Sequence, residues 1–349
     1  MQINPYSLNF GQEPIQFIPR NAQTQEVEQS FLLGTQQSYV ITGIRGCGKT
    51  VFLTNVCSKC KENNWIVVNI NLSNRDSALR QMLVKLAGES RLKKFPDFES
   101  LSLSVLGFGV QIGKKEFIKN DENDVTKLLE TAKKHNQKVL IAIDEVINSN
   151  SMKELISAFQ IWTRDKLPVY LIMTGLYENI KELQNSKALT FLYRCPRIDL
   201  VPLEKSAIKE NYQRNLKITE EQAIEMAKYT KGYSFAFQAL GYSVFLENEF
   251  NEDAINRCKT ILFDYSYMKI WDELSNNDRK VCVALAQSNN GSYAEIKDIL
   301  NWNNNQLNPY RRRLINKQIV ESKRKGEMNF SLPFFQDFVM DLIEFDEVY

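Results

Sequence analysis

Histidine is almost absent from this 349-residue chain, which has only His135. Zinc proteases that bind their metal through two histidines are therefore excluded, and a Ser-His-Asp triad would have to use this one residue. Six cysteines are too few for a disulfide-based scaffold. No apolar run approaches the roughly 20 residues that span a bilayer, and the first residues lack the basic and apolar regions of a signal peptide. We therefore expect a cytoplasmic protein with no membrane partner.

The net charge is also small, because 44 lysines and arginines face 42 acidic residues and leave a formal charge of +2. A uniformly basic nucleic-acid-binding surface is excluded, although a local basic patch is not. Hydrophobic residues make up 43% of the chain and charged residues 25%, which excludes disorder as the main state. At roughly 150 residues per domain, the length predicts two or three domains.

The first part of the chain alternates between apolar runs and helix-forming segments. Such alternation is typical of an α/β fold with a parallel sheet covered on both faces. Strands are predicted at residues 38–44, 65–72, 139–143, 169–174 and 197–203, and helices at 49–62, 76–91, 123–135 and 151–165. Residues 101–112 alternate twice between apolar and small or polar side chains, which favours either an edge extension of the sheet or an inserted β-hairpin.

The second part of the chain is predicted to be mainly helical. Three short helices, two strands around a charged turn at 323–327 and a final helix are expected near the C-terminus, an order that suits a winged helix-turn-helix. In the third of these helices, Asn308 and Pro309 are expected to be the cap and the first residue. The predicted domains are an α/β domain at 1–203, an all-helical lid at 204–263 and a winged-helix domain at 264–349.

A glycine-rich motif lies between the first predicted strand and the first predicted helix: Gly43-Ile44-Arg45-Gly46-Cys47-Gly48-Lys49-Thr50. It fits G-x-x-x-x-G-K-[ST] at each fixed position, in the strand-to-helix context that a P-loop requires. Glycines allow backbone N–H groups to surround phosphate oxygens, and the helix N-terminus adds partial positive charge. We expect ATP to bind here, with Lys49 at the β- and γ-phosphates and the Thr50 hydroxyl on Mg²⁺. Alkylation of Cys47, which lies within the loop, is expected to block nucleotide binding.

Acidic and hydroxyl side chains follow two of the later predicted strands. Asp144 and Glu145 come directly after the apolar run 139–143, and Thr174 ends the next run. A carboxylate beside a P-loop can hold Mg²⁺, which is the role expected of Asp144. Glu145 is then placed to orient or deprotonate the attacking water, and Thr174 to hold that water or sense the γ-phosphate. Each could instead simply end a strand at the surface, but the P-loop upstream favours the catalytic interpretation.

These features together resemble AAA+ ATPases. The closest likeness is to the archaeal-type ATPase group, near the initiator and signal-transduction (STAND) branches, and it extends from about Phe17 to the end of the chain. The resemblance implies a parallel-sheet P-loop nucleotide domain followed by a helical lid and a winged helix. It also implies that the stretch containing Pro19 and Arg20 contacts the adenine.

The resemblance further implies an arginine that reaches the γ-phosphate of a neighbouring subunit. Arg194 is the first candidate and Arg197 the second, and either would make hydrolysis depend on a nucleotide-dependent homo-oligomer. The alternative is a surface arginine that caps a helix. The chain departs from the family in two places. Residues 232–237 contain neither the sensor arginine of many AAA+ lids nor the Gly-x-Pro of STAND relatives, and Lys317-Gln318 stands where a winged helix usually has glycine before its first strand.

The proposed winged helix carries a local basic patch. Residues 309–325 contain seven basic side chains against Glu321, a net charge of +6. Such charge on a recognition helix and wing would bind double-stranded DNA. Five acids and no base follow in 334–349, and they could neutralise the patch internally. The predicted DNA contacts are Arg311, Arg312, Arg313, Lys323, Arg324 and Lys325.

Three classes of function remain open. The first is an ATPase that couples ATP binding and hydrolysis to assembly on DNA or to its remodelling. The second is a STAND-like nucleotide-gated signalling switch whose winged helix contacts protein. The third, a small-molecule kinase, is much less favoured because such kinases rarely carry a terminal winged helix.

Overall fold

The computed structural model describes residues 3–9, 14–98, 120–322, 324 and 326–345, apart from the side chains of residues 187, 188, 190 and 191. The hairpin or edge extension predicted at 101–112 lies outside the described residues. Within the described chain, no helix is both long enough and apolar enough to cross a membrane.

The chain divides into two compact units, and each is described by itself. The sheet unit comprises residues 20–42 and 49–199. The helical unit comprises residues 1–19, 43–48 and 200–349. The predicted boundaries at 203 and 263 stay a prediction.

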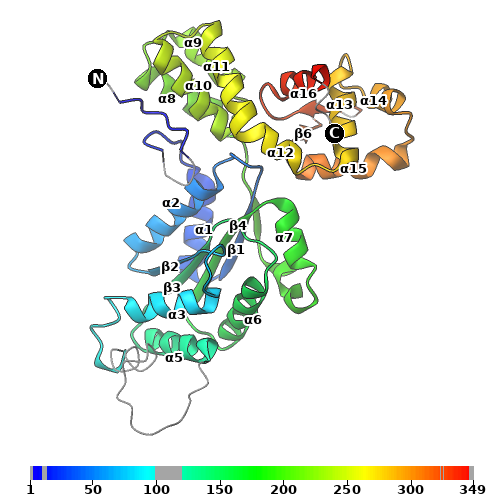
Figure 1. Ribbon diagram of the computed structural model, residues 1–349. Helices are drawn as coiled ribbons and strands as arrows, with labels where there is room; N and C mark the ends of the chain where they lie inside the picture. Colours follow the sequence, from blue (N-terminus) through cyan, green and yellow to red (C-terminus); the bar gives the residue numbers. More distant parts are fainter. Residues whose placement is uncertain (1–2, 10–13, 99–119, 323, 325, 346–349) are drawn as a thin grey trace. The chain divides into compact units, whose positions relative to one another are not determined.

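The sheet unit is built on a five-stranded parallel sheet (Figure 1). All five residues of β3 and all seven of β4 are buried, as expected for strands covered on both faces. This confirms the α/β prediction, although the last strand is shorter than predicted because its pairing with β1 ends at Asp199. The strands, in spatial order, are β2 (Ile66–Ile70), β3 (Val139–Ile143), β4 (Val169–Gly175), β1 (Ser38–Thr42) and β5 (Arg197–Asp199).

Helices flank this sheet (Figure 1), and polar residues define where several of them begin. The side chains of Ser77, Asn120 and Ser149 each accept a hydrogen bond from a backbone N–H group in the first turn, which satisfies a donor that the helix itself leaves unpaired. The helices are α1 (Asn21–Leu33), α2 (Lys49–Glu62), α3 (Ala78–Gly88), α5 (Asp121–Lys134), α6 (Asn150–Arg164), α7 (Tyr177–Gln184) and the 3₁₀ helix η1 (Lys187–Arg194).

The helical unit begins with four helices: α8 (Lys205–Asn215), α9 (Glu220–Tyr229), α10 (Ser234–Glu247) and α11 (Glu252–Leu262). The N-terminal segment packs against them, which the sequence did not predict. Tyr6 is buried and donates a hydrogen bond from its hydroxyl to Asn211 Oδ1 at 3.0 Å. Gly241 of α10 leaves room for this ring, because a Cβ there would lie 2.7 Å from it.

The helical unit continues with the π-helical turn η2 (Phe263–Tyr267), α12 (Met268–Asp272), α13 (Asn276–Gln287), α14 (Tyr293–Leu300), α15 (Asn304–Asn316), strands β6 (Val320–Glu321) and β7 (Asn329–Phe330), and α16 (Phe335–Glu344). This order matches the predicted elements, and the interpretation as a winged helix stays a prediction. The predicted start of the third helix is wrong. Asn303 caps α15 through a capping box with Gln306, and Pro309 lies inside the helix.

Candidate functional site

The phosphate loop, residues 43–48, turns sharply between β1 and α2. Gly46 and Gly48 have φ values of +76° and +93°, a region that residues with a Cβ rarely adopt. The Cys47 backbone N–H donates to the Ile44 carbonyl at 3.2 Å within this turn. The Cys47 side chain is buried, and a Cβ on Gly43 would lie 2.5 Å from its sulfur. The loop geometry therefore explains the glycines at positions 43, 46 and 48.

The start of α10 makes three hydrogen bonds to carbonyl groups of the phosphate loop. The Tyr233 hydroxyl donates to the Arg45 carbonyl at 2.8 Å. The Ser234 hydroxyl donates to the Cys47 carbonyl at 2.9 Å, and the Phe235 backbone N–H donates to the Gly46 carbonyl at 3.0 Å. These residues lie in the stretch 232–237, which lacks the motifs of related lids. Sequence reasoning missed this role, because nothing in the local pattern indicates a contact with a loop 187 to 189 positions away.

Residues from the C-terminal part of the helical unit also contact this loop. The Gln318 side-chain amide accepts from the Ile44 N–H and donates to the Leu200 carbonyl, each at 3.3 Å. Gln318 has a φ of +59°, a left-handed backbone conformation that favours glycine. Arg45 forms an ion pair with Glu273 at 2.9 Å. Neither Gln318 nor Glu273 carries a sequence signal for these contacts.

The sheet unit brings the predicted acidic and hydroxyl groups together at the carboxyl ends of β3 and β4. Asp144 Oδ2 accepts a hydrogen bond from the Thr50 hydroxyl at 2.7 Å. Asp144 Oδ1 accepts one from the Thr174 hydroxyl at 2.5 Å, and the Glu145 N–H donates to that same hydroxyl oxygen at 3.1 Å. Thr174 is fully buried, whereas the Glu145 side chain is exposed. Lys49, the first residue of α2, is 8% exposed.

Two neighbouring arginines differ in their surroundings. Arg197 pairs with Asp199 at 3.1 Å, and its guanidinium lies 5.5 Å from the centre of the Tyr177 ring. These three residues line a cleft of about 490 Å³. Arg194, the last residue of η1, is exposed and forms no ion pair among the described residues. Of the two candidates for a contact with another subunit, Arg194 is the one that has no ion-pair partner among the described residues.

The residues predicted to contact the adenine lie directly before α1. Pro19 is exposed and Arg20 is partly buried. The Arg20 carbonyl accepts a hydrogen bond from the Thr24 N–H at 2.9 Å, which begins the helix. The structure thus gives Arg20 a role at the start of a helix, and contact with adenine stays a prediction for both residues.

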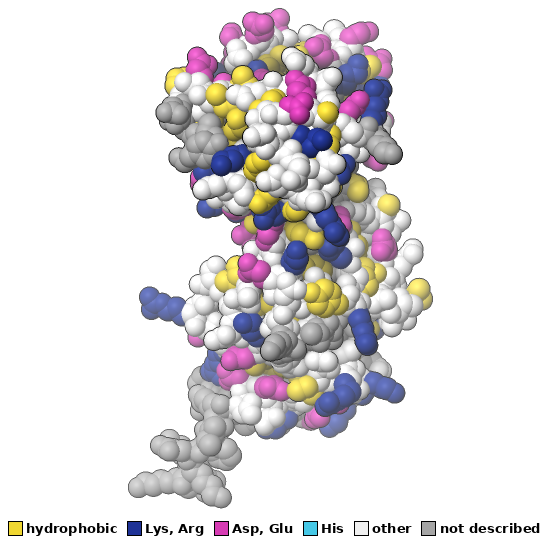
Figure 2. Space-filling model, turned by 90° about the vertical axis from the view of Figure 1, so that its right-hand side faces the viewer, with side chains coloured by type: hydrophobic (Ala, Val, Ile, Leu, Met, Phe, Trp, Pro, Cys, Tyr) yellow, Lys and Arg dark blue, Asp and Glu magenta, His cyan; other side chains and the backbone are white. Residues whose placement is uncertain are grey.

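The predicted DNA contacts are not equivalent. Arg313 donates to the buried carboxylate of Asp278 at 2.9 Å, and Arg311 donates to the Ser322 hydroxyl at 2.9 Å. Arg312 and Arg324 are exposed, whereas Lys323 and Lys325 lie outside the described residues. On the face shown in Figure 2, lysine and arginine side chains are interspersed with acidic ones.

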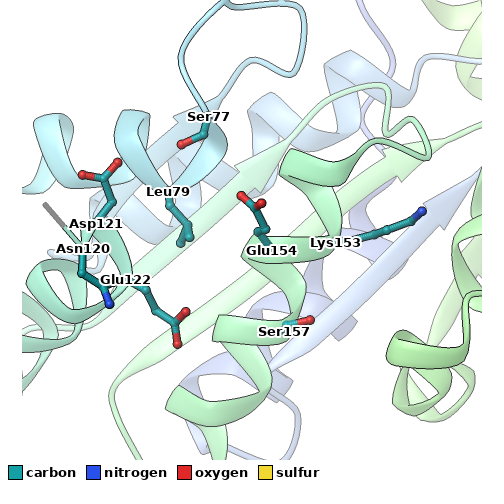
Figure 3. Close-up of a pocket in the computed structure, with 8 residues that line it drawn as sticks. All are labelled: Ser77, Leu79, Asn120, Asp121, Glu122, Lys153, Glu154 and Ser157. Carbon is teal, nitrogen blue, oxygen red and sulfur yellow. The ribbon is translucent and has the colours of Figure 1, made fainter. Parts of the chain in front are cut away.

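A separate groove of about 500 Å³ lies in the sheet unit (Figure 3). Three carboxylates and one amine line it, and Asp121 among them pairs with Arg80 at 3.4 Å. None of its lining residues belongs to the nucleotide-binding motifs. The residues in contact with the groove are Ser77, Leu79, Asn120, Asp121, Glu122, Lys153, Glu154 and Ser157.

Two family models match separate parts of the chain. Residues 17–173 match the model of an ATPase domain predominantly from Archaea. Residues 265–339 match a domain of unknown function, DUF8462. No curated protein matches the chain.

Solved structures show the same fold. The Walker-type ATPase PABY2304 of Pyrococcus abyssi is 17% identical, with a TM-score of 0.62 over 93% of this chain and 96% of that one. The ORC2 protein of Aeropyrum pernix, in ADPNP–ADP complexes, is 11% identical, with a TM-score of 0.59 over 98% of each chain. The protein therefore has the AAA+-like P-loop fold, and its residues 17–173 match the model of the archaeal-type ATPase domain.

Proposed function

We propose that this protein is a Mg²⁺-dependent ATPase that couples ATP binding and hydrolysis to assembly on double-stranded DNA or to its remodelling. The observation that carries the ATPase chemistry is the set of hydrogen bonds that joins Thr50, Asp144 and Thr174. Asp144 directly follows β3, Thr174 lies near the end of β4 and Thr50 lies in the first turn of α2. These positions support the proposal, because P-loop enzymes hold Mg²⁺ with such residues.

The oxygen atoms at this edge of the sheet fit a magnesium ion. Hydroxyl and carboxylate oxygens are the ligands that Mg²⁺ prefers, and the Thr50 and Asp144 oxygens lie 2.7 Å apart. The described residues contain no cluster of three or more acidic, cysteine or histidine side chains that would make a complete protein cage. A site of this kind suits a metal that also binds phosphate oxygens and water. Bound there, Mg²⁺ would neutralise charge on the β- and γ-phosphates.

The other residues of the site would each have a separate role in hydrolysis. Lys49 would bind the β- and γ-phosphates, together with the backbone of Gly43, Arg45, Gly46, Cys47 and Gly48. The exposed carboxylate of Glu145 would accept a proton from the attacking water. Thr174 would fix the backbone that carries this carboxylate, since its hydroxyl is bonded to the Glu145 N–H. Arg194 of a second copy would stabilise charge in the transition state.

The coupling to DNA is supported by the exposed basic and amide groups of the C-terminal region. Arg312 lies on α15, and Arg324 lies between β6 and β7. Asn304, Asn305 and Asn308 are also exposed on α15. Arginine binds phosphates and guanine edges, and asparagine binds adenine edges. The exposed side chains of this region therefore include the groups that bind duplex DNA.

The test is steady-state ATP hydrolysis with and without random-sequence duplex DNA at low salt, where phosphate contacts are strongest. We expect DNA to stimulate the wild type, and we expect Arg312→Ala/Arg324→Ala to lose this stimulation. Lys133→Ala/Lys134→Ala removes two exposed charges from α5 of the sheet unit and should behave like the wild type. Wild-type hydrolysis that DNA does not change would contradict the coupling to DNA.

A second candidate function is a nucleotide-gated switch whose C-terminal region binds a protein. The contacts of Glu273 and Gln318 with the phosphate loop favour it, because they link that region to the nucleotide-binding backbone. A switch predicts slow hydrolysis that DNA does not change and a protease cleavage pattern that differs between the ADP and ATP states. Identical patterns in the two states would argue against it.

A further inference from the structure

The backbone of the phosphate loop is held from one side by a short segment of the helical unit. Tyr233, Ser234 and Phe235, which we call the loop clamp, donate to the carbonyls of Arg45, Cys47 and Gly46 respectively. The distances are 2.8, 2.9 and 3.0 Å, all within the range of well-formed hydrogen bonds. Three successive carbonyl groups of the loop are thus fixed by three successive residues.

This arrangement determines the direction of the loop N–H groups. In a planar trans peptide, the C=O and N–H groups point in opposite directions. Carbonyls bound by the loop clamp therefore turn the following N–H groups, those of residues 46, 47 and 48, to the other side of the loop. Of these, the Cys47 N–H donates to the Ile44 carbonyl at 3.2 Å within the turn. The N–H groups of residues 46 and 48 are then turned to the side away from the loop clamp, and backbone N–H groups turned to one side of a loop can bind phosphate oxygens.

The chemistry of Tyr233 suits a permanent donor. Its side chain is buried, and burial raises the pKa of its hydroxyl well above the ordinary value, so the group stays protonated. The hydroxyl oxygen also lies 2.7 Å from Ser266 Oγ in η2. Gly46 must lack a side chain for this contact to form, because its Cβ would collide with the Tyr233 hydroxyl. The hydrogen bond from Tyr233 to the loop therefore requires glycine at position 46.

We propose that the loop clamp positions the phosphate loop for nucleotide binding, with Tyr233 and Ser234 as positioning residues. This inference rests on the proposed ATP-binding function of the loop. The loop clamp lies within residues 232–237, the stretch in which this chain lacks the sensor arginine of many AAA+ lids. It acts on the loop backbone rather than on the phosphate.

The experiment compares Tyr233→Phe with Tyr212→Phe, using titration with Mg²⁺-ADP and urea unfolding without nucleotide. Tyr212 is the matched control, because it is fully buried in the same unit and donates to the Phe237 carbonyl at 2.8 Å. Each variant loses one buried hydroxyl, so both urea midpoints should fall. Only Tyr233→Phe should also raise the Kd for ADP. The increase should be about fivefold, which corresponds to the net contribution of one hydrogen bond to the binding free energy. Adding Ser234→Ala should raise the Kd to about 30-fold above that of the wild type.

Lys49→Ala separates failure of the loop clamp from failure of the proposed function. If Lys49→Ala loses ADP binding while Tyr233→Phe and Ser234→Ala both bind like the wild type, the loop clamp is wrong and the nucleotide site stands. If the wild type does not bind ADP, both proposals fail. If Tyr233→Phe does not fold, the single variant Ser234→Ala decides the question, and an unchanged Kd in it overturns the proposal.

Discussion

The Thr174 hydroxyl joins the two acidic residues of the site. It donates to Asp144 Oδ1 at 2.5 Å and accepts from the backbone N–H of Glu145 at 3.1 Å. Glu145 has a φ of +54°, an uncommon value for a residue with a side chain. A hydroxyl that bonds both residues therefore holds a backbone conformation that would otherwise be disfavoured.

The first prediction concerns this hydroxyl. Thr174→Val keeps the shape of the side chain but removes both hydrogen bonds, so the backbone that carries the Glu145 carboxylate should lose its fixed conformation. We expect hydrolysis to slow by roughly 10²-fold, with ATP affinity changed only a few-fold. Thr131→Val is the control, because Thr131 is also buried in the sheet unit and its hydroxyl donates to the Lys127 carbonyl of its own helix. Normal hydrolysis in Thr174→Val, measured by phosphate release, would contradict the assigned role.

The second prediction concerns Glu145 itself. Glu145→Gln removes the proposed proton acceptor and leaves the side chain nearly unchanged in size. ATP should still bind, hydrolysis should fall by 10²-fold or more, and any ATP-dependent assembly should persist. Equilibrium binding, phosphate release and sedimentation of the same preparation test the three outcomes. A variant that hydrolyses ATP at the wild-type rate would show that another group acts on the water.

The third prediction is that Arg312 and Arg313, which are adjacent in α15, contribute differently to the free energy of unfolding. Arg313→Ala leaves the Asp278 carboxylate, which is 1% exposed, without its ion-pair partner. We expect a loss of about 2 kcal/mol in the free energy of unfolding, reduced from the value for a fully buried pair because Arg313 is partly exposed. Arg312→Ala should stay within about 0.5 kcal/mol of the wild type. Urea unfolding measures both, and equal effects of the two variants would refute the distinction.

The parts of the site that depend on local patterns could be predicted from the sequence. The apolar run Val139–Ile143 formed a strand at the expected residues, and Asp144, which follows it, accepts a hydrogen bond from Thr50. Parallel strands explain this success, since their carboxyl ends come together whatever the length of the chain between them.

The contacts that depend on packing between distant segments could not be predicted. Tyr233 reaches Arg45 across 188 positions, and Arg313 reaches Asp278 across 35. A basic residue in a sequence shows its charge but not whether a buried acid has already paired with it. The predicted start of α15 at Pro309 was wrong for a related reason. Proline favours the first turn of a helix, but the capping box formed by Asn303 and Gln306 begins α15 earlier in the chain.

The fourth prediction concerns the pH dependence of stability. Burial raises the pKa of Cys57 and Cys60 to about 12 and that of Cys195 to about 11, against an unfolded value near 9. Between these values the unfolded chain releases thiol protons that the native protein retains. Stability should therefore be unaffected by these thiols below pH 8 and should fall as the pH rises above 9, by up to about 1.4 kcal/mol per pH unit for each thiol.

Urea unfolding at pH 7.5 and pH 10 checks this expectation. Cys57→Ala provides the control, because it removes one titrating group and should make the decline with pH shallower. A free energy of unfolding that is the same at both pH values would contradict the prediction.

The fifth prediction concerns Arg194, the exposed arginine at the end of η1. If it acts on the nucleotide of a second copy, Arg194→Ala should slow hydrolysis by about 10³-fold and leave ATP affinity nearly unchanged. Mixing Arg194→Ala with Glu145→Gln, which should still bind ATP and assemble, should restore activity, because about a quarter of the interfaces would combine an intact Glu145 with an intact arginine. Arg197→Ala is the comparison, since Arg197 is paired with Asp199 of its own chain. Because two inactive variants can complement each other only across an interface, a mixture that stays inactive would exclude Arg194 as the arginine supplied by a second subunit.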